Sequence, residues 1–203
     1  MKKIFLIIFL FSISNIFAQY EIGGGMGLSF SNKPDLNDYL NMKFSNGSQL
    51  PSFSTSADFF ILVNYNISSK YQLGFEYDFN IYSYNSEIAI GRYDLQLLHH
   101  KPSILGYYYY AGNGFKLKLG GGLGLRICQA EEELYGSVEK YNTTGIGFIA
   151  KAQGDTKLSS NFYALIACEL NYDLPGEIKT LTNNSFDLGS FGVGLKLGVI
   201  YYY

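Results

Sequence analysis

Residues 115–127 read FKLKLGGGLGLRI, and this stretch decides the fold. Apolar side chains stand at positions 115, 117, 119, 123, 125 and 127, and lysine, glycine or arginine stands at each even position between them. Because successive side chains of a strand point to opposite faces, this alternation predicts a strand with one apolar and one polar face. Its length suits a tilted strand that crosses a bilayer, which needs about ten residues.

The same alternation recurs along the chain. It is clear in residues 71–81 and 191–203 and weaker in residues 20–30, 57–65, 93–110, 146–153 and 162–172. Tight turns are expected at residues 66–70, 111–114 and 157–161, and longer polar loops at residues 31–52, 85–91, 130–141 and 173–187. An even strand count with short turns at one end and long loops at the other is the outer-membrane pattern. The sequence therefore predicts an all-β, eight-stranded antiparallel up-and-down transmembrane β-barrel.

Composition supports strands over a helical bundle, because the chain is 17% aromatic and holds 23 Gly and only 4 Pro. The less apolar strand faces are rich in Gly, which weakens a solvent-facing strand but leaves room inside a narrow barrel. Tyrosines near the short turns predict an aromatic belt at the headgroup layer. A soluble lipocalin-like periplasmic barrel, with the apolar faces inside, is the structural alternative. We also expect a kink at Pro102 and a short amphipathic helix at residues 34–45.

The first residues predict export. Lys2 and Lys3 precede an apolar run at residues 4–11, and a more polar stretch leads to Ala18. Residues 1–18 are therefore predicted to be a cleaved signal peptide and residues 19–203 the barrel domain. The apolar run is short for a membrane span, which needs about 20 residues. The formal charge of −2 becomes −4 without Lys2 and Lys3, and no basic cluster is present. Nucleic acid is therefore excluded as a partner.

The polar strand faces carry nearly balanced charges. Eight strands leave an interior just wide enough for side chains to fill, and buried charges must pair. We therefore predict a plugged barrel with an interior charge network, and a narrow outer-membrane channel is the alternative. The residues expected to point inward are Glu21, Asp58, Glu76, Asp78, Asp94, Lys116, Lys118, Arg126, Lys151, Glu169 and Lys196.

No motif predicts catalysis, a cofactor or a metal. The Gly-rich stretches lack the Gly-Lys-Ser/Thr ending and the helix of a phosphate loop. His99 and His100 stand without a Cys/His cluster that would complete a metal site. Cys128 and Cys168 fall on opposite faces of strands that are not neighbours, so a disulfide, which needs Cα atoms within about 7 Å, is not expected.

Four segments give the chain a resemblance to small outer-membrane β-barrels of Bacteroidota and relatives, the OmpA-transmembrane/OmpX-like and PorT-like group. They are Phe17-Ala18-Gln19, PSILGYYYY at 102–110, LGGGLGLRI at 119–127 and FGVGLKLGVIYYY at 191–203. The resemblance implies a porin-like membrane protein of the Gram-negative outer membrane. It implies outer-membrane lipid and lipopolysaccharide as surroundings, and the barrel-insertion machinery, which recognises a terminal aromatic strand, as a partner in biogenesis. No activity follows from it.

The leading functional hypothesis is a non-enzymatic barrel whose surface loops contact an extracellular or envelope protein or maintain envelope integrity. Polar loops on a rigid scaffold are where binding function usually resides. The loop at residues 31–52 is the foremost candidate.

Overall fold

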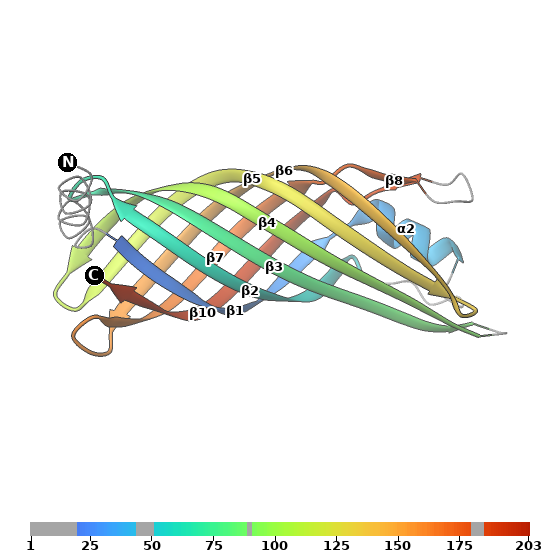
Figure 1. Cartoon of the computed structure of the whole chain (residues 1–203), viewed down its shortest axis with the longest axis horizontal. Coiled ribbons are helices and arrows are strands. Elements are labelled where there is room, and N and C mark those ends of the chain that lie inside the picture. The colour runs from blue at the N-terminus through green and yellow to red at the C-terminus, as the bar shows by residue number, and fades with distance from the viewer. Residues whose placement is uncertain (1–19, 44–50, 89–90, 180–184) are drawn as a thin grey trace, which may run out of the picture.

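The computed structural model describes residues 20–43, 51–88, 91–179 and 185–203, so the predicted signal peptide lies outside the described residues. Within them eight strands close into an antiparallel barrel in the order β1-β10-β7-β6-β5-β4-β3-β2 (Figure 1). The barrel strands are β1 (Tyr20–Asn32), β2 (Phe53–Asn66), β3 (Tyr71–Ile88), β4 (Gly91–Gly112), β5 (Phe115–Leu134), β6 (Ser137–Lys157), β7 (Phe162–Leu174) and β10 (Ser190–Tyr202). The predicted fold class is confirmed.

Three further elements lie in the long connections. Helix α2 (Pro34–Lys43) follows β1, which confirms the helix expected in the first loop. Strands β8 (Glu177–Lys179) and β9 (Ser185–Asp187) pair as a small hairpin between β7 and β10. Figure 1 shows α2 and β8 at one end of the barrel and the three short turns with the C-terminus at the other. We call these the loop end and the turn end.

The barrel closes through the first and last strands. Their register runs from Glu21 opposite Tyr202 to Asn32 opposite Phe191. This pairing removes both sheet edges, as a barrel in lipid requires. The described part of the chain contains no helix that is long and apolar enough to cross a membrane.

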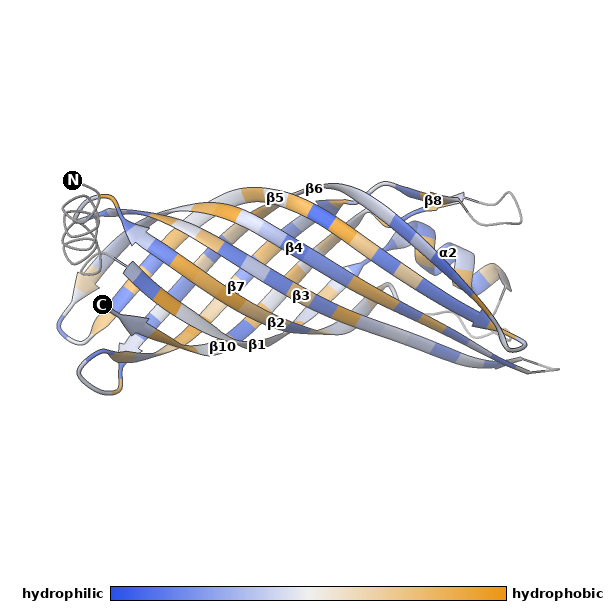
Figure 2. Cartoon of the chain, in the orientation of Figure 1, coloured by the Kyte–Doolittle hydropathy of each residue, from blue (hydrophilic) through white to orange (hydrophobic). Residues whose placement is uncertain are grey.

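The apolar faces of the strands point outward. Met26, Ile61 and Leu119 are each more than 60% exposed, whereas Glu21 and Lys196 inside the barrel are 0% exposed. Figure 2 shows hydrophilic and hydrophobic residues alternating along the strands. An apolar exterior around a charged interior is stable in hydrocarbon and unfavourable in water. The soluble lipocalin-like alternative is therefore wrong.

The four central strands are longer than the sequence predicted. Residues 85–91 and 130–141 were expected to be loops, but β3, β4, β5 and β6 continue through most of these positions as two paired hairpins. At the tip of the second hairpin Tyr135 and Gly136 both have positive φ, 53° and 79°. Two such residues form the tight turn that matches the twist of paired strands.

These longer strands form what we call the extension, residues 82–88, 91–98, 128–134 and 137–144 at the loop end. Its polarity is opposite to that of the barrel wall below it. Tyr93, Leu95 and Leu97 point inward and are at most 3% exposed, whereas Gln96 and Gln129 are exposed on the outer face. Outside the bilayer the outer face meets water, so the polar residues belong there and the apolar residues form a core.

This change of polarity corrects one predicted residue. Asp94 was expected inside the barrel, but it lies on the outer face beside Tyr93, which occupies the inward position. There it forms an exposed ion pair with Arg92 at 2.7 Å.

Pro102 leaves β4 continuous and interrupts its pairing on one side. Lys101 and Pro102 have partners on β3 but none on β5, where the register resumes at Ser103. The interruption follows from chemistry, because proline has no N–H to donate to a neighbouring strand. Cys128 lies inside the barrel and Cys168 outside it, both as free thiols, which confirms the expectation of no disulfide.

Candidate functional site: a charged interior beneath an apolar cap

The interior charges gather in three clusters along the barrel axis. The first, near the turn end, is built on Glu21, which accepts hydrogen bonds from Lys116 and from Lys118 at 2.5 Å. Lys118 also pairs with Asp155 at 3.1 Å, and the Tyr202 hydroxyl donates to Asp155 at 2.6 Å. Two lysines therefore face two carboxylates, and this turn-end cluster is formally neutral.

The second cluster, the central cluster, is organised by Lys196. Its ammonium lies 2.9 Å from Glu76 and 2.8 Å from Glu169 and also contacts Asp78. Lys151 binds Glu76 at 2.5 Å from the opposite side. All five side chains are at most 4% exposed. Buried charges at such distances are stable only when paired, and here each carboxylate has a lysine partner.

The central carboxylates would otherwise suggest a metal site. Ligand atoms of Glu76, Asp78 and Glu169 lie within 4.8 Å of one another, and oxygen ligands suit hard cations. The ammonium of Lys196, however, already contacts all three carboxylates. The Lys196 ammonium thus takes the place that a metal ion would occupy, and the three carboxylates are arranged around it.

The third cluster lies nearer the loop end and is built on Asp173. This carboxylate accepts a hydrogen bond from Arg126 and pairs with Lys101 at 3.0 Å. Close by, Asp58 accepts hydrogen bonds from Ser29 and Asn80. The cluster also includes Lys33, which follows β1 and is 4% exposed. Burial and the neighbouring Lys101 lower the pKa of Lys33 to about 8.

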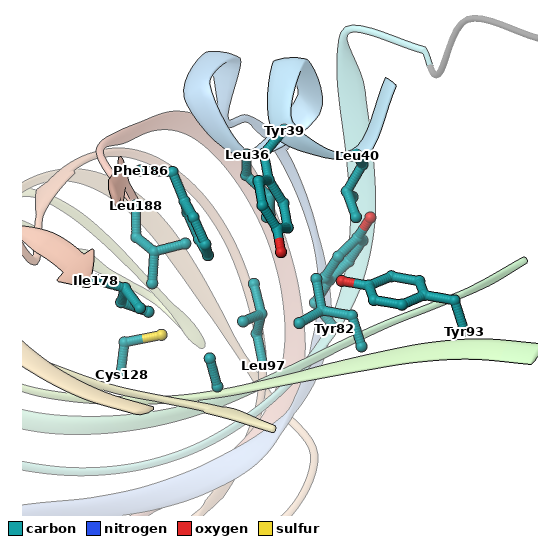
Figure 3. Packing of buried hydrophobic residues seen from close by; sticks show 12 residues of the cluster. Leu36, Tyr39, Leu40, Tyr82, Tyr93, Leu97, Cys128, Ile178, Phe186 and Leu188 are labelled. Atoms are coloured by element: carbon teal, nitrogen blue, oxygen red, sulfur yellow. The ribbon is translucent and has the colours of Figure 1, made fainter. Parts of the chain in front are cut away.

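Above these charges the barrel mouth is closed by apolar side chains, which we call the cap (Figure 3). Leu36, Tyr39 and Leu40 of α2 pack inward against side chains of β3, β4, β5 and the β8–β9 segment. The remaining members of the cap are Tyr82, Tyr93, Leu95, Leu97, Cys128, Ala130, Ile178, Phe186 and Leu188. The cap covers the charges with a layer from which water is excluded.

One carboxylate is partly buried at the edge of the cap. Glu132 accepts hydrogen bonds from the hydroxyls of Tyr39 and Tyr93, both at 2.7 Å. Burial, reinforced by the hydrogen bond to Glu132, raises the pKa of Tyr39. In the sequence Glu132 belongs to an acidic run that was interpreted as a solvated loop. The strand places it inward between two outward-facing glutamates.

Glycines make room for the long charged side chains. A Cβ at Gly194 would lie 2.8 Å from the Glu169 side chain, and one at Gly147 would overlap the Arg126 guanidinium. This close packing explains why the polar strand faces combine Gly with a few charges.

The structure brings most of the predicted interior residues into ion pairs. Glu21, Lys116 and Lys118 meet at the turn end, Glu76, Asp78, Lys151, Glu169 and Lys196 meet in the centre, and Arg126 and Asp58 lie in the third cluster. Asp94 does not join them. Sequence reasoning missed Lys33, Lys101, Asp155 and Asp173 as members. Asp155 and Asp173 each lie just past a predicted strand end, and continuing the alternation by one step would have found both.

The histidine pair is divided by the barrel wall. His99 points inward and is 3% exposed, while His100 lies on the outer side, where its Nδ1 is 2.6 Å from the Tyr77 hydroxyl. Side chains on opposite faces of one strand cannot act on the same atom. The two histidines therefore do not form a joint catalytic or metal site.

No family model matches the chain, and no curated protein matches its sequence. Solved structures with the same architecture include the following three. Neisserial surface protein A aligns over 91% of this chain and 97% of its own, with 16% identity and a TM-score of 0.56. Ail, the attachment invasion locus protein of Yersinia pestis, gives the same coverage with 14% identity and a TM-score of 0.56. OprG of Pseudomonas aeruginosa aligns over 92% of this chain and 97% of its own, with 14% identity and a TM-score of 0.53.

At these identities the similarity concerns the fold. The closed barrel and its apolar exterior indicate a membrane location, because a sheet satisfies all its backbone hydrogen bonds in a bilayer only when it is closed. The chain is an eight-stranded β-barrel protein of the Gram-negative outer membrane.

Proposed function

We propose that this protein is a non-enzymatic outer-membrane barrel, plugged by its own side chains, that presents the extension to a partner outside the cell. The observation that carries the proposal is the extension itself. Four paired strands rise from the lipid-facing wall, with a polar outer face and an apolar core sealed by α2. We also propose that the protein is related to the PorT-like outer-membrane barrels of Bacteroidota.

The plugged interior is supported by three successive barriers. The turn-end and central clusters fill the bore with paired charges, and the cap fills the mouth with apolar side chains. An ion crossing the bore would have to break buried ion pairs and then pass a layer of mostly apolar side chains, and each step is costly. Planar-bilayer recordings of the purified protein test this point. We expect no reproducible single-channel steps, whereas steps of constant size would favour the narrow-channel alternative.

The contact surface is supported by the geometry of the extension. On the outer faces of its strands stand Gln96, Gln129 and other polar or charged side chains, held at fixed spacing by the strand pairing. A rigid surface loses little conformational freedom on binding, which favours affinity. By contrast, α2 turns Leu36 and Leu40 into the cap. We therefore place the contact on the extension before the loop at residues 31–52.

A photo-crosslinking amino acid tests the contact in intact cells. It is introduced at Gln96 or Gln129 on the extension and, as the matched control, at Leu119, which is 64% exposed in the lipid-facing band. We expect a discrete protein adduct from the two extension positions and lipid adducts from position 119. If positions 96 and 129 yield no protein adduct in cells that display the barrel, the proposed contact surface is wrong. The bilayer recordings judge the plug separately.

A further inference from the structure

A small cavity lies in the third cluster, inside the barrel. Its volume is about 10 Å³, close to what one water-sized occupant needs. Lys33, His99, Lys101 and Asp173 line it together with serines of β1. The lining residues come from β1 with Lys33 just after it, and from β3, β4, β7 and β10, so the cavity is part of the packed interior.

The charges around the cavity do not balance. Within the third cluster Lys33, Lys101 and Arg126 are three cations, whereas Asp58 and Asp173 are two carboxylates. The cluster therefore has a local excess of one positive charge, opposite in sign to the excess of the central cluster. Asp173 is shared by Arg126 and Lys101. The excess charge therefore falls on Lys33.

Lys33 is an unusual buried lysine. Its ammonium donates hydrogen bonds to the hydroxyls of Ser31 and Ser54, the latter at 3.2 Å, and lies 5.0 Å from the Tyr82 ring centre. Within the described residues no salt bridge joins it to a carboxylate. A desolvated charge with only neutral partners is costly. A pKa of about 8 keeps this ammonium mostly protonated at neutral pH.

A second group at the cavity lacks a hydrogen-bond partner. The Nε2 atom of His99 is buried and makes no hydrogen bond within the described part of the chain. Buried polar atoms without partners are rare in folded proteins. The His99 side chain is 3% exposed and lines the same cavity as Lys33. The Lys33 ammonium and an unpartnered ring nitrogen of His99, which is a donor in its Nε2–H tautomer, thus line one small space.

We propose that this cavity binds a monatomic anion, with chloride as the physiological ligand, held by the Lys33 ammonium and the Nε2–H of His99. The anion places a counter-charge in contact with the Lys33 ammonium and accepts a hydrogen bond from each of the two groups. A polyatomic anion such as phosphate is excluded by the volume. A water molecule would satisfy the hydrogen bonds but would leave Lys33 without a counter-charge in direct contact, so it is the alternative that the experiment must separate.

The test compares the folded barrel in chloride and in gluconate at equal ionic strength and pH 7. Gluconate is too large for the cavity. The midpoint of thermal unfolding is read from the change in gel mobility between folded and unfolded barrel. We expect chloride to raise the midpoint in a saturable manner, by roughly 3–5 °C at ten times its dissociation constant. Lys33→Gln should lose this dependence, and Lys140→Gln, which removes an exposed lysine paired with Glu131, should keep it.

Crystals grown in bromide provide a direct readout that does not depend on how the variants fold. Anomalous scattering should place one bromide between the Lys33 Nζ and His99 Nε2 atoms. Equal midpoints in chloride and gluconate, together with no anomalous peak in the cavity, would overturn the proposal and assign the space to water. A chloride effect of the same size in wild type and both variants would also overturn it, because it would be a general salt effect.

Discussion

Replacing Lys196 by Met tests how far the central cluster stabilises the barrel. The change removes the ammonium that contacts Glu76, Asp78 and Glu169 and keeps a side chain of similar length. Carboxylate oxygens of these residues lie within 4.8 Å of one another. At an effective dielectric constant near 20, two like charges at that distance repel by about 3 kcal/mol. With Lys151 as the remaining cation, the formal charge of the cluster changes from −1 to −2.

The expected loss in the free energy of unfolding is about 3–5 kcal/mol, the usual cost of removing one partner from a buried ion pair. Urea unfolding of the barrel in lipid vesicles, followed by gel mobility, measures it. The matched control is Arg92→Met, which breaks the exposed pair with Asp94 and should cost about 0–1 kcal/mol. Adding Asp78→Asn to Lys196→Met returns the cluster to a formal charge of −1 and should recover a large part of the loss. If Lys196→Met and Arg92→Met are equally stable, the central cluster does not stabilise the fold as argued.

Three further changes test other parts of the structure. Gly194→Ala should destabilise the barrel by about 1–3 kcal/mol, because the new Cβ would lie 2.8 Å from the Glu169 side chain. The control is Gly106→Ala, whose new Cβ would have no atom within 4 Å, and it should be neutral or slightly stabilising in the same urea titration. Leu40→Ala should cost about 2–5 kcal/mol and expose α2 to protease, since Leu40 is 0% exposed in the cap; unchanged proteolysis would contradict this. The pKa of Lys33 in the folded barrel is lowered to about 8, so above that pH the unfolded chain binds more protons than the folded one. In chloride-free buffer the stability of the wild type relative to Lys33→Gln should therefore rise between about pH 8 and 10.5, by up to about 3 kcal/mol. A stability difference that does not change with pH would show that Lys33 is not desolvated.

The membrane-spanning part of this protein could be predicted from sequence because one rule governs it. Lipid requires an apolar outer face, and strand geometry then fixes every second residue. Strands such as β5 and β10 obey that rule with few exceptions, and in the structure their lysines and arginine lie on the inward face. The rule also gives the strand order, since short turns join neighbours in an up-and-down barrel.

The extension could not be predicted because the rule reverses there. Above the bilayer the outer face of β4 becomes polar and the inner face apolar, so Leu95 and Leu97 point inward while Leu117 and Leu119 of β5 point to lipid. In the sequence this reversal looks like a break in the alternation, which is the usual sign of a loop. The misassignment of Asp94 has the same cause.

The cavity beside Lys33 could not be predicted from the sequence either. Lys33 belongs to a segment that composition marks as a polar loop, and nothing in the local pattern shows that the segment turns back into the barrel mouth. Its burial depends on the packing of α2 over residues from β3, β4 and β5. Such a convergence of distant segments is a property of the tertiary structure.

The cap and the charge clusters depend on each other energetically. The ion pairs are strong only where water is excluded, because the attraction between two charges falls as the effective dielectric constant rises. The cap excludes that water at the loop end, and the ring of Tyr202 beside Lys116 and Lys118 covers the turn end. A change that opens the cap, such as Leu40→Ala, should therefore weaken the third cluster beneath it as well as the local packing. If it does, Leu40→Ala and Lys101→Met will show non-additive losses in a double-mutant cycle, since both act on the pairing of Asp173. Additive losses would show that the cap and the charges are independent layers.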